Sequence, residues 1–220
     1  MPADELLPDP LPADPMSMFA TWFSDARTRQ VQPNPDAMVV ATVGDNAAPS
    51  ARVVLCKRLV ADQGFVVFFT NYESRKGHEL TARPRAAAVF HWDTMQRQVR
   101  LEGPIVRSPA PESDQYFATR AFESRVGAWA SKQSEPLASR EQLTEQVREV
   151  MHRLGVGPGA QGEVPRPPHW GGFRLWVDTI ELWAEGAGRI HERALWRRAL
   201  TRKDEFSYTG GLWRATRLNP

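Results

Sequence analysis

A succession of short apolar segments separated by turns limits the folds open to this chain more than any other feature. Five segments rich in β-branched and aromatic residues follow one another, at residues 38–43, 52–59, 65–70, 86–90 and 98–107. Such residues fit a pleated sheet, and short connections join strands that run in opposite directions. The pattern predicts an antiparallel sheet or a barrel.

Helices are expected to flank this sheet. Asp14 and Pro15 are typical of a helix start, and an apolar stripe of helical spacing follows them. Residues 112–122 also have a helical pattern, and a capping box at Ser139 opens a long amphipathic helix that ends at Gly155. Four further strands are predicted near residues 172–176, 180–184, 190–196 and 212–218. We therefore expect a mostly β (α+β) protein.

Composition limits the class of protein. The 220 residues fit one domain, expected from residue 14 to 220 behind a flexible, proline-rich N-terminal arm at 1–13. The 28 Lys and Arg residues nearly balance 26 Asp and Glu, so the net charge of +2 does not favour nucleic acid or a membrane surface as partner. No apolar run approaches the roughly 18 residues of a membrane span.

The single cysteine, Cys56, rules out an intramolecular disulfide and favours a reducing compartment. Its apolar neighbours indicate a core thiol. A cytoplasmic location is expected. The single cysteine and the scattered histidines have no metal-ligand spacing, so no metal site is predicted.

Four cations bracket the segments 52–59 and 65–70, which the pattern predicts to be one hairpin. Arg52 and Lys57 lie in the first segment, and Arg75 and Lys76 follow the second, just after Ser74, a candidate helix N-cap. These cations and the free N–H groups of a helix start would form a phosphate site. Solvated charges at strand edges are the alternative from these residues alone.

A second anion site is predicted downstream. Tyr116 and Arg120 have the i, i+4 spacing of one helix face, and Ser124 follows just past the expected helix end. A tyrosyl hydroxyl, a guanidinium and a serine hydroxyl together can hold a phosphate dianion. An aromatic anchor beside a surface arginine is the alternative.

The alternation of side chains along a strand predicts which side of the sheet two further sets of residues face. In the strand at 98–107, Val99 would face the core and Gln98 the opposite side, toward a cofactor edge or solvent. On the strand near 190–196, Arg189, His191 and Arg193 would share one side for the same reason.

This succession of motifs resembles the pyridoxamine 5'-phosphate oxidase family. The similarity spans residues 37–220 and rests on motifs at residues 96–100, 116–124, 127–134, 170–174, 180–183 and 189–193. It implies an FMN-binding split barrel with flanking helices, working as a homodimer with FMN at the subunit interface. It also implies oxidation of pyridoxamine 5'-phosphate and pyridoxine 5'-phosphate to pyridoxal 5'-phosphate, with O2 as acceptor and H2O2 as product.

The resemblance also implies roles for individual residues. The residues that match the FMN site are Arg52, Val53, Val54, Leu55, Cys56, Lys57, Phe69, Thr70, Arg75, Lys76, Gln98, Gln133, Ser134, Trp183 and Arg193. Those that match the substrate site are Lys57, Tyr116, Arg120, Ser124, Arg189, Ile190 and His191. Arg189 and His191 would lie over the substrate ring and be the catalytic pair.

The sequence departs from the family pattern at two positions. It also leaves two alternative functions open. Phe69 stands where a tyrosine is expected, and Ala121 where proline often follows the arginine. A related flavin oxidase of phenazine biosynthesis and a non-catalytic flavin- or B6-binding module are the alternative functions. Amine against alcohol preference, the strength of the dimer, a second product site and the role of residues 201–211 stay undetermined.

Overall fold

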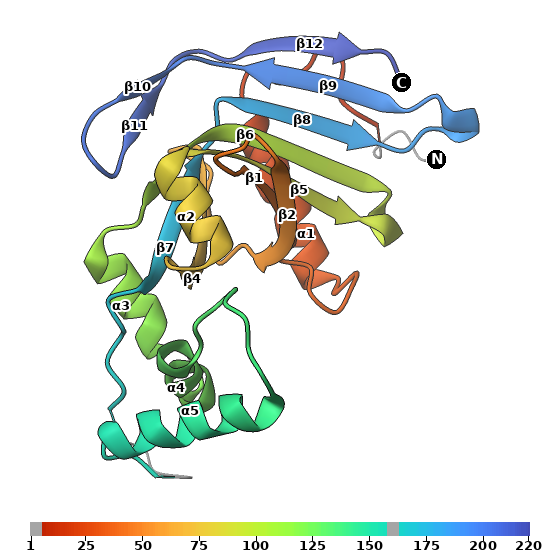
Figure 1. Ribbon diagram of the computed structural model, residues 1–220. Coiled ribbons are helices and arrows are strands. Elements are labelled where there is room, and N and C mark those ends of the chain that lie inside the picture. The colour runs from red at the N-terminus through yellow and green to blue at the C-terminus, as the bar shows by residue number, and fades with distance from the viewer. Residues whose placement is uncertain (1–5, 158–162) are drawn as a thin grey trace.

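The computed structural model describes residues 6–157 and 163–220 and is mostly antiparallel β-sheet with flanking helices, as predicted (Figure 1). The strands are β1 (Ala37–Val43), β2 (Pro49–Leu55), β3 (Arg58–Val60), β4 (Phe65–Asn71), β5 (Arg85–Trp92), β6 (Arg97–Arg107), β7 (Trp170–Trp176), β8 (Thr179–Ala184), β9 (Glu192–Arg197), β10 (Leu200–Arg202), β11 (Tyr208–Gly210) and β12 (Arg214–Leu218). The helices are α1 (Pro15–Thr28), α2 (Arg75–Ala82), α3 (Ala110–Ala118), α4 (Phe122–Ala130) and α5 (Arg140–Arg153), with 3-10 turns η2 (Asp93–Met95) and η3 (Ala187–Arg189).

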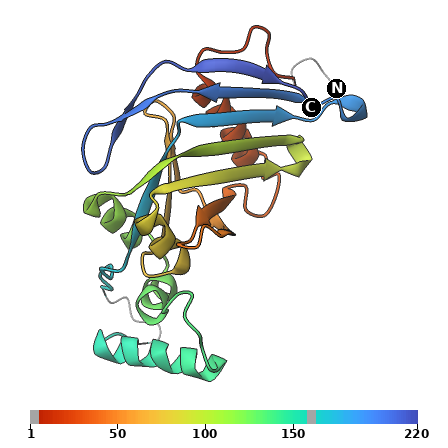
Figure 2. The same ribbon diagram turned by 45° about the horizontal axis from the view of Figure 1, so that its top comes forward.

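The large sheet divides into two parts that share β6. One part has the strand order β12-β9-β8-β6-β5-β1-β2, and the other consists of β3, β4 and β7. The first half of β6 pairs with β8, whereas residues 105–107 pair with β7. Figure 2 shows the long strands side by side, with helices α3 to α5 beneath one end. This division opens the sheet as a split barrel.

Helix α1 fills the concave side of the larger part. Asp14 caps it by accepting a hydrogen bond from the Met16 N–H at 2.9 Å, as predicted. Its apolar stripe is buried, and the rings of Phe19 and Phe23 pack on Phe90 of β5 with centroids 5.3 and 5.7 Å apart. The spacing of apolar residues in this helix therefore predicted its buried face correctly.

The expected hairpin of residues 52–59 and 65–70 is only partly correct. β2 pairs along its whole length with β1, and only the short β3 pairs with β4. The strand breaks at Cys56 and Lys57, whose N–H groups donate to Asp36 on one side and Val67 on the other. The chain therefore crosses there from one part of the sheet to the other, which alternation alone does not reveal.

The predicted helix at 112–122 is two helices. α3 ends at Ala118, and Arg120 lies in the connection before α4, whose first turn carries Ser124. The expectation that Tyr116 and Arg120 share a helix face is therefore wrong. Their side chains nevertheless converge, because the chain turns between the two helices.

The cap of α5 at Ser139 is confirmed, but the reciprocal bond of the predicted capping box is shifted by one residue, since Gln142 Oε1 accepts from the Ala138 N–H at 2.9 Å. Ser139 accepts a hydrogen bond from the Gln142 N–H, and the helix ends at Arg153 shortly before Gly155, which has a φ of 65°. Helices α3 to α5 bury an apolar cluster of their own against Trp170. None of the helices in the described ranges has the length and apolar character needed to cross a membrane.

Residues 6–13 contact the sheet, whereas the composition predicts a flexible arm at 1–13. Leu7 is buried, and the indole of Trp196 donates a hydrogen bond to the Pro12 carbonyl at 2.8 Å. Residues 1–5 of the predicted arm lie outside the described residues. At the other end, the segment 201–211 forms the hairpin of β10 and β11, and the last strand begins at Arg214 rather than 212.

Gly103 lies where β6 passes from one part of the sheet to the other. A Cβ atom there would lie 1.8 Å from the carbonyl oxygen of Trp176. We expect Gly103→Ala to lower the free energy of unfolding by about 2 kcal/mol or more, because neither backbone can move without breaking strand pairs. Chemical denaturation followed by circular dichroism measures this. Gly157→Ala, where no atom of the described residues lies within 4 Å of the added Cβ, is the matched control. Equal stability of the two variants would contradict the prediction.

Candidate active site

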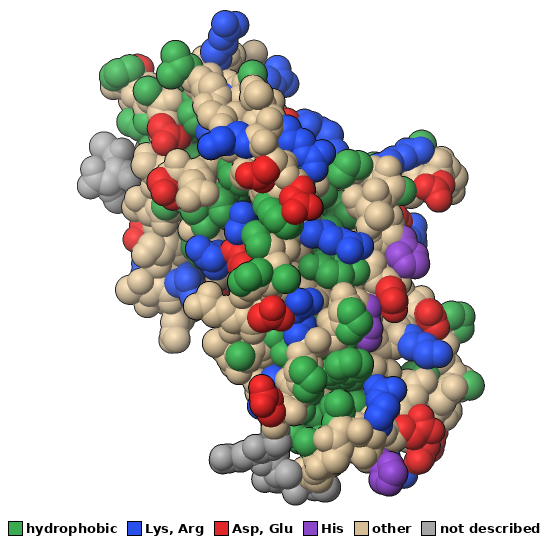
Figure 3. Space-filling view, turned by 90° about the vertical axis from the view of Figure 1, so that its left-hand side faces the viewer, with side chains coloured by type: hydrophobic (Ala, Val, Ile, Leu, Met, Phe, Trp, Pro, Cys, Tyr) green, Lys and Arg blue, Asp and Glu red, His purple; other side chains and the backbone are tan. Residues whose placement is uncertain are grey.

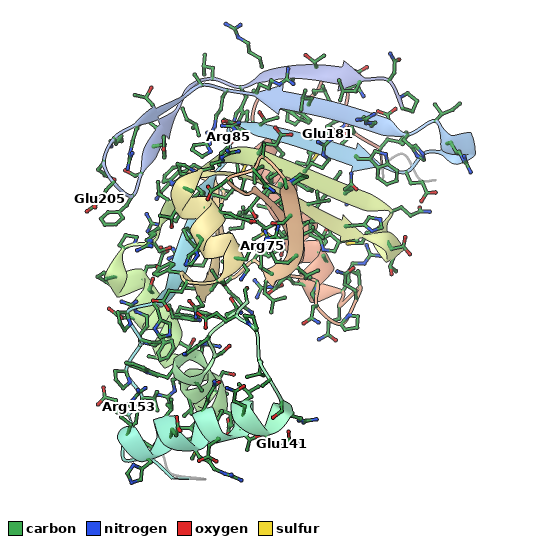
Figure 4. The ribbon with its side chains drawn as sticks, in the orientation of Figure 1. Arg75, Arg85, Glu141, Arg153, Glu181 and Glu205 are labelled. Atoms are coloured by element: carbon green, nitrogen blue, oxygen red, sulfur yellow. The ribbon has the colours of Figure 1, made fainter. Side chains whose placement is uncertain are left out.

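A cavity of about 800 Å3 lies between β2, the end of β4, the start of α2 and the α3–α4 region. Five cationic side chains line it, and none of the described lining residues is acidic; the cations are Arg52, Lys57, Arg75, Lys76 and Arg120. The four cations of the predicted first site thus line one cavity, but Lys57 lies apart from the other three. Figure 4 labels Arg75 beside α2 and β2. The surface in Figure 3, by contrast, carries basic and acidic side chains intermixed.

A buried carboxylate, Glu79, lies beneath two of these cations. It accepts hydrogen bonds from Arg75 Nε at 2.9 Å and Arg52 Nη2 at 3.3 Å. The hydroxyls of Ser50, at 2.7 Å, and Thr42 also donate to it. Burial raises the pKa of Glu79, but these hydrogen bonds outweigh it and lower the pKa to about 2. Glu79 thus holds Arg52 and Arg75 in place.

Lys76 is a buried amine with no acidic partner among the described residues. Its Nζ donates to Gln133 at 2.8 Å, Thr70 at 2.9 Å and Ser74 at 3.1 Å, all neutral oxygens. Burial, followed by repulsion from Arg52, lowers the pKa of Lys76 to about 8. An anion beside this amine would favour its charged form and raise this pKa again.

The start of α2 adds backbone donors to the same end of the cavity. Ser74 caps the helix as predicted, since its Oγ accepts a hydrogen bond from the Gly77 N–H. The N–H groups at the very start of a helix have no carbonyl partner within it, and the helix dipole favours an anion there. The side chains of Arg75 and Lys76 therefore lie at a helix N-terminus, a place where proteins commonly bind anions.

At the other end, Tyr116, Arg120 and Ser124 line the cavity together with Lys57. The guanidinium of Arg120 lies 4.6 Å over the Trp170 ring, and its buried Nη1 has no hydrogen-bond partner among the described residues. Burial lowers the pKa of Arg120 and raises that of Tyr116. A ligand with an acceptor atom beside this nitrogen would satisfy it.

Aromatic rings form the wall between the two ends. Phe69 stacks on Tyr116 with centroids 4.1 Å apart, and Trp170 continues the stack 5.6 Å from Phe69. Phe69 has no hydroxyl to offer, as the sequence indicated, and here it supports Tyr116 instead. Trp170 was not among the predicted site residues; its place in the motif at 170–174 was the available signal.

A loop after α4 closes over the cations. Gln133 accepts hydrogen bonds from both Thr70 and Lys76, and Asn71 donates to the Ser131 carbonyl at 3.3 Å. Ser134 has a φ of 78°, in the left-handed region that few residues other than glycine adopt. Gln133, Ser134 and the β2 residues Val53, Val54 and Leu55 all line the cavity. Cys56 does not; it is a buried core thiol, and burial raises its pKa to about 12.

The remaining predicted site residues form a second group, away from the cavity of the same chain. They are Gln98, Trp183, Arg189, Ile190, His191 and Arg193, on β6, β8, β9 and the β8–β9 connection. Gln98 pairs with Trp183, and Trp183 pairs with Arg193 across the strands. The His191 ring lies 4.7 Å from that of Trp183.

The predicted strand at 190–196 begins only at Glu192, so alternation does not apply to Arg189 and His191. Arg189 lies in η3 with a φ of 65°, and Gly186 makes the tight turn possible because a Cβ there would lie 1.7 Å from the Ile190 carbonyl oxygen. The Gly186 N–H donates to His191 Nδ1 at 3.2 Å. A neutral imidazole at His191 therefore carries its proton on Nε2.

Two carboxylates that position site residues were not found from the sequence. Glu181, on β8 and labelled in Figure 4, is buried and accepts hydrogen bonds from Arg193 at 2.9 Å and Arg100 at 3.0 Å. Glu79 lies four residues after Arg75, which was a readable signal for a pair on one helix face. No such spacing marks Glu181.

The described residues contain no cluster of three or more His, Cys, Asp or Glu that could bind a metal ion.

Comparison with solved structures defines the class of fold. An FMN-binding protein from Nostoc punctiforme, related to pyridoxamine 5'-phosphate oxidase, superposes with a TM-score of 0.66 at 15% identity, covering 93% of this chain and 96% of that one. PhzG from Burkholderia lata, solved with tetrahydrophenazine-1-carboxylic acid, superposes with a TM-score of 0.81 at 30% identity, covering 96% and 95%. The fold is that of the FMN-binding split barrels.

Sequence relatives narrow this class to a family. Proteins named pyridoxine/pyridoxamine 5'-phosphate oxidase from Burkholderia lata and Burkholderia vietnamiensis are 47% and 48% identical over 207 residues, or 94% of this chain and 89% of theirs. The pyridoxamine 5'-phosphate oxidase family model matches residues 24–153, and that of the pyridoxine 5'-phosphate oxidase C-terminal dimerisation region matches residues 170–220. The chain belongs to the pyridoxamine 5'-phosphate oxidase family.

Glu79 generates a prediction about acid stability. Its pKa falls from 4.5 to about 2 on folding, so the ionised carboxylate stabilises the fold above pH 4.5, and this stabilisation is lost as the pH falls toward 2. We expect Glu79→Gln to be less stable than wild type by about 2–3 kcal/mol at pH 7, and the difference to shrink below pH 4.5. Urea denaturation between pH 7 and pH 3 measures it. Glu145→Gln, which removes an exposed ion pair with Arg148, serves as control and should show no such pH trend. A difference between Glu79→Gln and wild type that does not change with pH would contradict the prediction.

Proposed function

We propose that the protein is an FMN-dependent oxidase that converts pyridoxine 5'-phosphate and pyridoxamine 5'-phosphate to pyridoxal 5'-phosphate. The observation that carries this proposal is a single cavity with cations at both ends and no lining carboxylate among the described residues. Such a cavity suits two phosphate dianions, one from the cofactor and one from the substrate. Family membership supports a flavin oxidoreductase.

The residues at the α2 end fit the phosphate of FMN. Arg52 and Arg75 are held by Glu79, and Lys76 is a buried amine that lacks an anionic partner. A phosphate there would receive charge-assisted hydrogen bonds from groups already in place. Gln133 supplies an amide at the same end, and the β2 wall gives apolar contact for a ring system.

The residues at the α3–α4 end fit the phosphate of the substrate. Lys57, Tyr116, Arg120 and Ser124 offer two cations and two hydroxyls. The unpartnered Nη1 of Arg120 is satisfied if a phosphate oxygen accepts its hydrogen bond. An unphosphorylated substrate would leave the half-buried cations Lys57 and Arg120 without an anionic partner.

Positioning is the proposed contribution of the protein to the reaction. When bound, FMN supplies a hydride acceptor and passes the electrons to O2, which yields H2O2. The alcohol needs only O2, whereas the amine also takes up water and releases ammonia. Arg189 and His191 would orient the carbon that is oxidised, with His191 presenting Nε2–H because Nδ1 is occupied by the Gly186 N–H.

A homodimer would bring the two groups of site residues together. Val53 and Val39 pair across β2 and β1 and are 64% and 41% exposed on the outer face of the sheet. Val39 pairs in turn with Val89, and along the same face lie Gln98 and Trp183. Exposed apolar side chains beside half of a site favour a partner surface. We propose that a second copy covers this face, as the match to a dimerisation region supports.

The alternative function is oxidation of a phenazine precursor, since PhzG has a similar structure. Identity favours the B6 substrate, because relatives named pyridoxine/pyridoxamine 5'-phosphate oxidase reach 47%, whereas PhzG of the same organism reaches 30%. The phosphate-binding set at Lys57 and Arg120 also favours it, because a carboxylic acid carries less charge than a phosphate dianion. Activity on both substrates decides between them.

The first test is the oxidation of pyridoxine 5'-phosphate. It is measured by oxygen uptake and, without oxygen, by bleaching of the flavin spectrum. Wild type should prefer the phosphorylated vitamer to pyridoxine by at least about 100-fold, and Arg120→Ala should raise KM at least about 10-fold while flavin content stays unchanged. Arg153→Ala on α5, outside the cavity, is the control. Equal turnover of pyridoxine, or preference for tetrahydrophenazine-1-carboxylic acid, would contradict the proposal.

The second test uses the pKa of Lys76. Because the free amine has a pKa of about 8 and a bound phosphate favours its charged form, FMN affinity should fall as the pH rises above 8, by at most about 10-fold per pH unit. Quenching of flavin fluorescence between pH 7 and pH 9.5 gives the dissociation constants. Lys76→Arg, which stays charged throughout, should show a flat profile. A wild-type profile as flat as that of Lys76→Arg would show that Lys76 does not contact the anion.

A further inference from the structure

Glu112 forms a second buried carboxylate clamp, outside the cavity. Its side chain is 8% exposed and accepts hydrogen bonds from Arg58 Nη1 at 2.7 Å and Arg174 Nε at 2.9 Å. The Arg174 side chain is 16% exposed, whereas that of Arg58 is 54% exposed. The clamp is thus closed on one side by protein and open to solvent on the other.

The three residues of the clamp come from three elements that meet at the substrate end of the cavity. Arg58 opens β3 directly after Lys57, Arg174 lies on β7, and Glu112 lies in the first turn of α3. Tyr116 follows Glu112 by one helical turn, so both lie on the same side of α3. The clamp therefore joins the backbone that carries Lys57 to the helix that carries Tyr116.

The stack of aromatic rings makes the position of Tyr116 in the cavity depend on the clamp at Glu112. Tyr116 lies nearly parallel to Phe69, with an interplanar angle of 19° and centroids 4.1 Å apart. A shift of α3 would slide the Tyr116 hydroxyl along that ring and change its distance from Lys57. Glu112 lies in the first turn of this helix of nine residues, one turn before Tyr116.

The hairpin of β10 and β11, for which the sequence indicated no role, covers this clamp. Leu200 and Tyr208 pack on an apolar cluster of Phe65, Val67 and Trp176. The guanidinium of Arg174 lies 5.0 Å over the Phe65 ring, and its Nη1 donates to the Phe206 carbonyl at 3.5 Å. The hairpin thus excludes water from Arg174 and strengthens its pairing with Glu112.

We infer that Glu112 is a positioning residue for the substrate phosphate, acting through Arg58 and Arg174 to set Tyr116 against Lys57. This inference rests on the proposed function. It assigns the hairpin at 200–210 to the support of the substrate site. It also makes Glu112 a determinant of selectivity for the phosphorylated vitamer, although Glu112 does not line the cavity.

The experiment measures three variants of the full-length protein loaded with FMN. Glu112→Gln breaks both arms of the clamp, Arg58→Gln breaks only the half-exposed arm, and Asp114→Asn breaks an ion pair with Arg166 on the same helix as control. The dissociation constants of pyridoxal 5'-phosphate and of pyridoxal are measured by tryptophan fluorescence. Kinetics with pyridoxine 5'-phosphate and FMN titration accompany them.

We expect Glu112→Gln to raise KM and the dissociation constant of pyridoxal 5'-phosphate by about 10-fold or more, because it leaves two arginines unpaired. Arg58→Gln should raise both by about 2–5-fold, and Asp114→Asn by less than about 2-fold. Pyridoxal binding, kcat and FMN affinity should change little. A general loss of structure would weaken all ligands alike, so the ratio of the two vitamers identifies positioning.

Two results would overturn the inference in different ways. If the wild type oxidises pyridoxine 5'-phosphate but Glu112→Gln and Arg58→Gln bind both vitamers as Asp114→Asn does, the clamp has no positioning role. If the wild type neither oxidises pyridoxine 5'-phosphate nor binds pyridoxal 5'-phosphate, the proposed function itself fails, and the inference with it. Should Glu112→Gln not fold, Arg58→Gln, which leaves the Arg174 arm intact, decides.

Discussion

Strand β6 is the element on which the arrangement of the whole molecule depends. It pairs with β5 and β8 over its first part and with β7 over its last residues, so both parts of the sheet share one backbone. Gly103 permits the crossing, since the Trp176 backbone passes where a side chain would begin. Because the two parts diverge from β6, the ends of β2 and β4 leave a space between them, and the cavity lies there.

Two buried carboxylates hold arginines in and beside this cavity. Glu79 holds two arginines and Glu112 holds two more, one of them next to Lys57 in the chain, while no described residue that lines the cavity is acidic. A ligand anion therefore meets donors that are already oriented, and little reorganisation opposes its binding. Burial of the two cations Lys76 and Arg120 opposes their charged forms, and it lowers their pKa values in the free protein.

Much of the fold and of the cavity could be predicted from the sequence, because local signals and tertiary structure agree there. The Asp14 cap, the stripe of α1 and the cap at Ser139 are confirmed, as is the family. The break at Cys56 and the division into α3 and α4 were missed, because each depends on backbone hydrogen bonds to distant strands or on a turn without glycine or proline. Roles of the second group, including Arg189 and His191, stay predictions.

Helices α3 to α5 enclose an apolar cluster separate from that of the barrel, which includes Phe117, Val126 and Trp170. Elements with separate clusters can open with different free energies, as amide hydrogen exchange reveals in other proteins. Local unfolding of this helical layer would release Tyr116, Arg120 and the Gln133 loop, while β2 with Arg52 and the β2–β3 connection with Lys57 stay folded. Exchange rates in the helical layer would then report ligand occupancy, whereas those of β5 and β6 would report global stability.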